Sequence, residues 1–190
     1  MIRNINTSTM KKPLRIMVFA LLAFGMIACG GNRKKLTPED VQAAQATLFN
    51  ANKTLNKEEA PKVAELYCQY VKQNPNDTTV VKWLYHAMEI NVMMKDAEKS
   101  IELCDQLLEQ YPQSKWAPMS LLLVGSFVYE DMLNDTALAH AAYQKLIDNY
   151  PESVLVNDAQ KSIEYLGLSQ DERMSRIITS QMDVEETVDL

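Results

Sequence analysis

The sequence predicts an all-α protein built as a short α-solenoid of antiparallel helix pairs. The composition favours helix, because Ala, Leu, Glu, Lys, Gln and Met are plentiful and the 190-residue chain contains only five glycines. A motif that ends helices, Asn or Tyr followed by Pro, recurs at Pro75, Pro112 and Pro151, with spacings of 37 and then 39 residues. Paired helices with such a period are typical of solenoids, in which each pair buries its apolar face against its neighbours. A plain helical bundle is the alternative, since apolar helices of similar length can mimic a period.

The first element in chain order is a secretion signal over residues 1–28. Residues 1–15 carry four basic residues and no acid, and residues 16–27 are apolar apart from Gly25. A run of this length would rise only about 18 Å as a helix, whereas the hydrocarbon core of a membrane is about 30 Å thick. We therefore expect a cleaved signal peptide, not a permanent membrane span.

A lipid attachment site follows the signal. Met26-Ile27-Ala28-Cys29 resembles the lipobox of bacterial lipoproteins. In that family the signal is cleaved before the cysteine, the sulfur takes a diacylglycerol, and the new amino group takes a further acyl chain such as palmitate. The resemblance thus implies lipidation of Cys29, and two or three acyl chains would hold the protein firmly at a membrane. An ordinary signal peptide with a chance cysteine is the alternative.

Residues 29–36 are predicted to form a flexible tether, because two glycines and Asn32 are followed by three cations. The cations would be attracted to anionic headgroups. Position 30 is Gly and not Asp, so by resemblance to lipoprotein sorting rules the outer membrane is expected. No acidic cluster follows Cys29, which favours a protein facing the periplasm over one on the cell surface.

The charge balance excludes nucleic acid as a partner. Removal of residues 1–28 takes away four of the 19 basic residues and none of the 25 acidic ones, which leaves a net charge of −10. Binding to nucleic-acid backbones needs a basic face. Cys68 and Cys104 are the other two thiols; they either pair as a disulfide in an oxidising periplasm or serve as small buried apolar side chains.

The repeat domain is expected over residues 37–167. Apolar or small residues stand twelve, eight and five places before each of the three prolines, which puts one apolar stripe on a helix. Good N-cap residues, Asp77, Ser114 and Ser153, stand two places after them. The expected helices lie near residues 38–52, 58–73, 77–93, 95–110, 115–133, 136–149 and 153–166.

The carboxyl end, residues 168–190, is expected to form a capping helix and an acidic tail. Ser169 and Glu172 form a capping box for a short helix near residues 170–180. Its apolar side, which includes Met174, Ile177 and Ile178, is expected to cover the last repeat. Four acids in residues 183–190 and the lack of a packing pattern there predict a disordered tail.

The stretch from Ala139 to Tyr165 resembles the tetratricopeptide repeat (TPR) pattern of outer-membrane assembly lipoproteins of the BamD type and of related periplasmic TPR proteins. The matching residues are Ala139, Tyr143, Leu146, Tyr150, Pro151, Ser153 and Ala159. The resemblance extends in weaker form over residues 57–167. It implies a TPR-like solenoid that binds a peptide in a concave groove lined by the first helix of each pair.

Five residues are candidates for lining that groove. The helix over 115–133 is apolar nearly all round, so Trp116, Met119 and Leu123 are left on a second face once the repeat positions pack inward. Tyr85 and His86 would join them from the preceding first helix. The alternative is that a helix in the middle of a short array is surrounded on all sides and these residues are core.

The sequence offers no catalytic or cofactor motif. His86 and His140 have no ligand-spaced partners for a metal, and there is no Gly-rich phosphate loop or nucleophile elbow. We therefore expect no enzymatic activity, no cofactor and no metal site. The function expected is that of a lipid-anchored scaffold or adaptor that mediates protein–protein interactions at the outer membrane, in envelope assembly. A surface-exposed ligand-binding or nutrient-binding lipoprotein is the alternative.

Overall fold

The computed structural model describes residues 35–188 of the chain. Within that range there is no β-strand, only an isolated bridge between Phe49 and Leu55. None of the helices described is long and apolar enough to span a membrane. The predicted signal peptide, Cys29 and most of the predicted tether lie outside the described residues.

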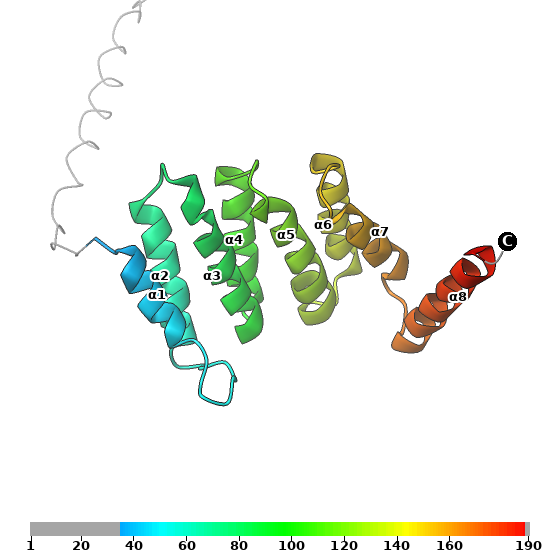
Figure 1. Cartoon of the computed structure of the whole chain (residues 1–190), viewed down its shortest axis with the longest axis horizontal. Coiled ribbons are helices and arrows are strands. Elements are labelled where there is room, and N and C mark those ends of the chain that lie inside the picture. Colours follow the sequence, from blue (N-terminus) through cyan, green and yellow to red (C-terminus); the bar gives the residue numbers. More distant parts are fainter. Residues whose placement is uncertain (1–34, 189–190) are drawn as a thin grey trace, which may run out of the picture. The chain divides into compact units, whose positions relative to one another are not determined.

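The described chain is a series of helices placed side by side in sequence order (Figure 1). The elements are α1 Pro38–Ala46, α2 Ala60–Gln73, the 3₁₀-helix η1 Thr78–Val80, α3 Val81–Met94, α4 Ala97–Gln110, α5 Trp116–Leu123, the π-helix η2 Val124–Met132, α6 Thr136–Asn149, α7 Val156–Tyr165 and α8 Gln170–Val188. Helices α1, α3 and α5–η2 are the first helices of pairs whose second helices are α2, α4 and α6. The predicted α-solenoid of antiparallel helix pairs is confirmed.

The same turn ends each second helix. Asn74, Tyr111 and Tyr150 have nearly identical backbone dihedrals, with φ between −134 and −130° and ψ between 49 and 54°. Each precedes a proline, and the proline ring disfavours the α conformation in the residue before it. Asp77, Ser114 and Ser153 then accept the backbone N–H two residues further on, as their capping pattern predicts.

A second turn recurs inside the pairs. Lys95 and Asn134 adopt the left-handed conformation, with φ of 62° and 51°. The aspartate that follows each of them, Asp96 or Asp135, accepts the N–H three residues later and so caps the next helix. Two turn types therefore alternate along the chain and keep the first helices on one side of the array.

The predicted apolar stripes form the core. The repeat positions of the second helices are less than a tenth exposed at Val63, Tyr67 and Tyr70, at Ser100, Cys104 and Leu107, and at Ala139, Tyr143 and Leu146. Leu108, Tyr129 and Tyr150 pack against both halves of this core, so the apolar interior continues from pair to pair. Continuity of this kind is what stabilises a solenoid, because a single pair cannot bury its own face.

Gly125 allows close packing within the third pair. A Cβ atom at this position would lie 2.6 Å from Cε1 of Tyr143, a ring that is fully buried. The Tyr143 hydroxyl donates a hydrogen bond to Oε2 of Glu130 at 3.3 Å, which fixes the ring on η2. Burial, together with the charge of Glu130, raises the pKa of Tyr143 to about 12.

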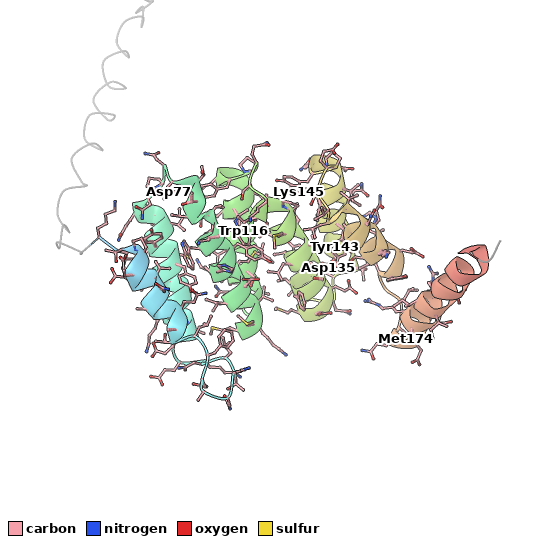
Figure 2. The ribbon with its side chains drawn as sticks, viewed as in Figure 1. Asp77, Trp116, Asp135, Tyr143, Lys145 and Met174 are labelled. Atoms are coloured by element: carbon pink, nitrogen blue, oxygen red, sulfur yellow. The ribbon has the colours of Figure 1, made fainter. Side chains whose placement is uncertain are left out.

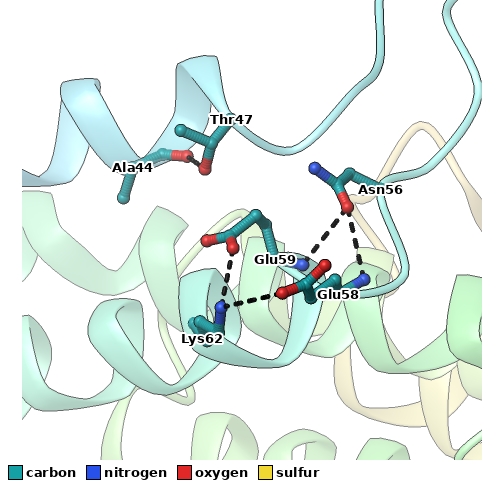
Figure 3. A network of polar contacts seen from close by, with 6 residues as sticks. All are labelled: Ala44, Thr47, Asn56, Glu58, Glu59 and Lys62. Carbon is teal, nitrogen blue, oxygen red and sulfur yellow. Dashed lines mark hydrogen bonds and ion pairs between the residues drawn. The ribbon is translucent and has the colours of Figure 1, made fainter.

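The first helix is shorter than predicted. It ends at Ala46 and not near residue 52, and residues 47–59 form a loop. The reason is local: the Asn52 side chain accepts hydrogen bonds from both the backbone and the hydroxyl of Thr54, which competes with helical pairing. Asn56 then accepts from the N–H groups of Glu58 and Glu59 where α2 begins, and Lys62 pairs with both glutamates (Figure 3).

The helix predicted over residues 115–133 changes type at its middle. It is α-helical to Leu123 and π-helical from Val124 to Met132, and the N–H of Leu133 bonds to the carbonyl of Val128 five residues earlier. Gly125 is a weak helix former, and the Ser126 hydroxyl donates a hydrogen bond to the carbonyl oxygen of Leu122 at 2.9 Å. Leu123 and Phe127 consequently lie on one wall of a groove described below.

The prediction for the carboxyl end is wrong in two respects. Helix α8 continues to Val188, so residues 183–188 are helical; no Gly or Pro follows Gly167 to end the helix. The side chains expected to cover the last repeat are instead exposed, with Met174 at 59% and Ile178 at 50% (Figure 2). The arginine side of α8 faces the array, because Arg173 pairs with Glu130 and Arg176 with Glu164.

Cys68 and Cys104 are unpaired in the structure. Cys104 is buried in the core and Cys68 is partly buried. Burial raises the pKa of each thiol to about 11. They are apolar packing residues in this structure and have little thiolate character at neutral pH.

Replacement of Gly125 by Ala tests the packing in the third pair. The new methyl group would press on the Tyr143 ring, and we expect this contact to outweigh the helix preference of Ala and to lower the free energy of unfolding by about 1–2 kcal/mol. Urea unfolding followed by circular dichroism measures the change. Adding Tyr143→Leu should make the double variant less destabilised than the sum of the two single variants; strict additivity would contradict the proposed contact.

Candidate functional site

A groove lies along the first helices α3 and α5–η2. Its main hollow has a volume of about 810 Å³. The side chains that line it are Glu89, Val92, Met93, Lys95, Leu123, Phe127, Asp131 and Met132. We call this the first-helix groove. Its size suits several large side chains of a bound segment.

A smaller hollow of about 170 Å³ continues the groove toward α1. It is lined by residues that include Gln45, Phe49 and His86, and it shares Glu89 and Met93 with the main hollow. The groove therefore crosses three successive first-helix segments: the end of α1, then α3, then η2.

Large apolar side chains are left exposed along this path. Phe49 is 50% exposed, Met93 is 45% exposed and Phe127 is 50% exposed. Such side chains are normally buried in a core, and a row of them on one concave surface marks an interaction site. Methionine in particular adapts its shape to different partners.

Two carboxylates line the main hollow, Glu89 from α3 and Asp131 from η2. Oε2 of Glu89 lies 2.6 Å from Nδ1 of His86, one turn earlier on α3. Burial raises the pKa of Tyr85, and the charge of Glu89 raises it further. Lys95 is the cation among the side chains that line the main hollow.

The structure separates the five residues predicted to line the groove. Leu123 lies in the main hollow and His86 in the smaller one. Tyr85 and Trp116 form an aromatic cluster with His86: the ring centroids of Tyr85 and Trp116 are 4.8 Å apart, and those of His86 and Trp116 are 5.6 Å apart. Tyr85 is 6% exposed, and Trp116 packs against the core between the helices (Figure 2). Tyr85 and Trp116 line neither hollow. We call Tyr85, His86 and Trp116 the supporting cluster, because their rings join α3 to α5.

Met119 belongs to a different hollow. This second hollow, of about 700 Å³, lies where α5 and α7 begin, and Met119 lines it together with Tyr150, Pro151 and Val154. The structure therefore does not bring Met119 and Leu123 to the same site, although they stand only four residues apart.

Sequence reasoning missed Phe49, Met93, Phe127 and the two carboxylates. One signal was present in the sequence: Phe127 stands four residues after Leu123, so the two side chains are expected on the same face of a helix. The position of Phe49 in the lining of the groove could not be predicted, because the sequence predicts a helix through residue 52 and the structure has a loop there.

The described residues hold no group of three or more His, Cys, Asp or Glu side chains that could bind a metal ion. The polar side chains that line the two hollows are those of Gln45, Tyr67, His86, Glu89, Lys95 and Asp131. The arrangement suits the binding of a peptide segment.

Comparison with known protein families decides the type of repeat. A family model of the tetratricopeptide repeat matches residues 84–114 and 120–153. Over these two segments the chain matches the tetratricopeptide repeat. The first match covers most of α3 and all of α4, and the second runs from the end of α5 through η2 and α6, so each is a helix pair that ends at the serine after the proline turn. Neither a curated protein nor a solved structure matches the chain significantly.

The TPR assignment explains the layout of the groove. Tetratricopeptide repeats are interaction modules, and this groove lies on the first helices of the matched pairs. The solenoid is TPR-like, and proteins are the class of partner that such a scaffold takes.

The distinct places of Trp116 and Phe127 can be tested by stability. We expect Trp116→Ala to lower the free energy of unfolding by about 2–4 kcal/mol, because the contacts with Tyr85 and His86 and part of the core packing are lost. Phe127→Ala should change it by no more than about 0.5 kcal/mol, because this side chain is half exposed. Urea denaturation of both variants measures the difference. Equal losses would contradict the division into supporting cluster and groove surface.

Proposed function

We propose that this protein is a lipid-anchored TPR scaffold of the bacterial cell envelope, which binds segments of other envelope proteins in its first-helix groove and carries out no chemistry itself. The observation that carries the binding role is the row of exposed apolar side chains that line the groove, Phe49 in the loop after α1, Met93 on α3 and Phe127 on η2. Residues with no packing role of their own are available to a partner.

The supporting cluster makes the groove suitable for repeated binding. Trp116, Tyr85 and His86 pack against one another, His86 also lines the smaller hollow, and Trp83 links the cluster to Tyr67. A cluster of packed rings is rigid, so a bound segment would lose entropy while the scaffold loses little. A preorganised groove of this kind fits an adaptor that binds and releases partners.

The envelope location rests on the amino-terminal sequence. The basic start, the apolar run and Met26-Ile27-Ala28-Cys29 support export and lipidation at Cys29. Gly30 supports the outer membrane, and the lack of an acidic cluster directly after Cys29 supports the periplasmic side. The resemblance of residues 139–165 to TPR lipoproteins of the BamD type supports a part in envelope assembly.

Site-specific crosslinking tests the groove. A photoreactive amino acid placed at Phe127 in the full chain, in living cells, should capture a discrete partner protein. The matched control is the same probe at Leu138, which is 45% exposed on the second helix α6, outside the groove. We expect no discrete product there, and Met93→Asp should abolish the Phe127 product. A product that persists in the Met93→Asp variant would contradict binding in the groove.

Lipidation can be tested independently. Mass spectrometry of the protein from membranes should find an amino terminus at Cys29 that carries acyl chains, and Cys29→Ser should accumulate as an unprocessed precursor. A mature terminus elsewhere, or a free thiol on Cys29, would refute the anchor but would leave the groove assignment untouched.

A further inference from the structure

The main hollow lies at the carboxyl ends of two neighbouring first helices. Helix α3 ends at Met94 and η2 at Met132, and the hollow is lined by Met93 and Lys95 from one and by Asp131 and Met132 from the other. The carbonyl groups at the end of a helix carry partial negative charge. Two helix ends that adjoin one hollow thus favour a cation in it.

The charged side chains reinforce this preference. Glu89 on α3 and Asp131 on η2 add carboxylates to the lining of this hollow. Glu89 stands beside the buried Tyr85 and close to His86, where water is partly excluded and an added charge interacts more strongly than in bulk solvent. Lys95 offsets one of the two carboxylates, so the lining of the main hollow keeps an excess of negative charge. The chain as a whole carries a formal charge of −6, which would attract a basic partner from a distance.

The apolar part of the hollow defines the rest of the ligand. Met93 on α3 and Phe127 on η2 are half exposed, and Leu123 at the end of α5 lines the same hollow. A ligand that carried only charge would leave these side chains in water. A ligand with only apolar groups would desolvate Glu89 and Asp131 without pairing them, which is costly.

We propose that the first-helix groove recognises a partner segment in which a large apolar side chain stands next to a lysine or arginine. The apolar side chain lies between Met93 and Phe127, and the cation lies between Glu89 and Asp131. This inference rests on the proposed function, because it names the chemistry of the segment that the scaffold binds.

Binding of two synthetic peptides tests the charge preference. The probes are a fluorescein-labelled peptide of leucine and lysine at helical spacing and the same peptide with each lysine replaced by glutamate. The full lipidated chain in phosphatidylcholine nanodiscs is titrated against each probe, with empty nanodiscs as the blank. We expect the lysine peptide to bind at least about tenfold more tightly than the glutamate peptide, and this ratio to fall as salt is added.

Variants of the groove assign the preference to its carboxylates. Glu89→Gln with Asp131→Asn should weaken binding of the lysine peptide by about tenfold or more, whereas Lys95→Gln should strengthen it severalfold. The matched control is Glu98→Gln with Glu109→Gln, two exposed acids on α4 that alter the net charge equally but lie outside the groove. The control should change affinity by less than about twofold.

The outcomes separate this inference from the proposed function. If the glutamate peptide binds as well as the lysine peptide, or if the control variant matches the groove variant, the charge preference is overturned. If neither peptide binds while a probe at Phe127 still captures a partner, the inference is also overturned and the scaffold function stands. If the Phe127 probe captures nothing as well, both fail.

Discussion

Reversal of the chain at the three proline turns is the constraint on which the rest of the structure depends. A residue that precedes proline is disfavoured in the α conformation, so α2, α4 and α6 must end at Asn74, Tyr111 and Tyr150. The three residues adopt the same dihedrals, and the next helix begins in the same direction each time. Repetition of one reversal is what places successive first helices next to each other and creates a shared surface along them.

The groove surface and the core are formed by the same helices. One face of α5–η2 is buried against α6, where Gly125 admits the ring of Tyr143. The opposite face carries Leu123, Phe127 and Asp131 into the groove. The aromatic cluster of Tyr85, His86 and Trp116 joins α3 to α5, and its member His86 also lines the smaller hollow. On α5–η2, the residues of one face therefore have structural roles, and the residues of the opposite face line the groove.

The charged residues have structural as well as functional parts. Glu130 accepts the Tyr143 hydroxyl and pairs with Arg173, and it thereby links the π-helix to α8. Its neighbour Asp131 points instead to the groove lining. These two carboxylates are adjacent in the sequence of η2 but lie on different surfaces. The pairing of Arg173 and Arg176 with the array is also why the apolar side of α8 is turned outward.

The sequence by itself determined most of the helices, the proline turns, the buried stripes and the repeat type, because these follow from local dihedral preferences and from a periodicity that every pair repeats. It also placed Leu123 and His86 at the groove. Only the tertiary structure decided that Trp116 and Tyr85 pack in a cluster outside the lining, that Met119 belongs to another hollow, and that Phe127, Glu89 and Asp131 line the same one. The physical reason is that the exposed face of a helix depends on which other helices pack against it, and the local sequence does not specify those helices.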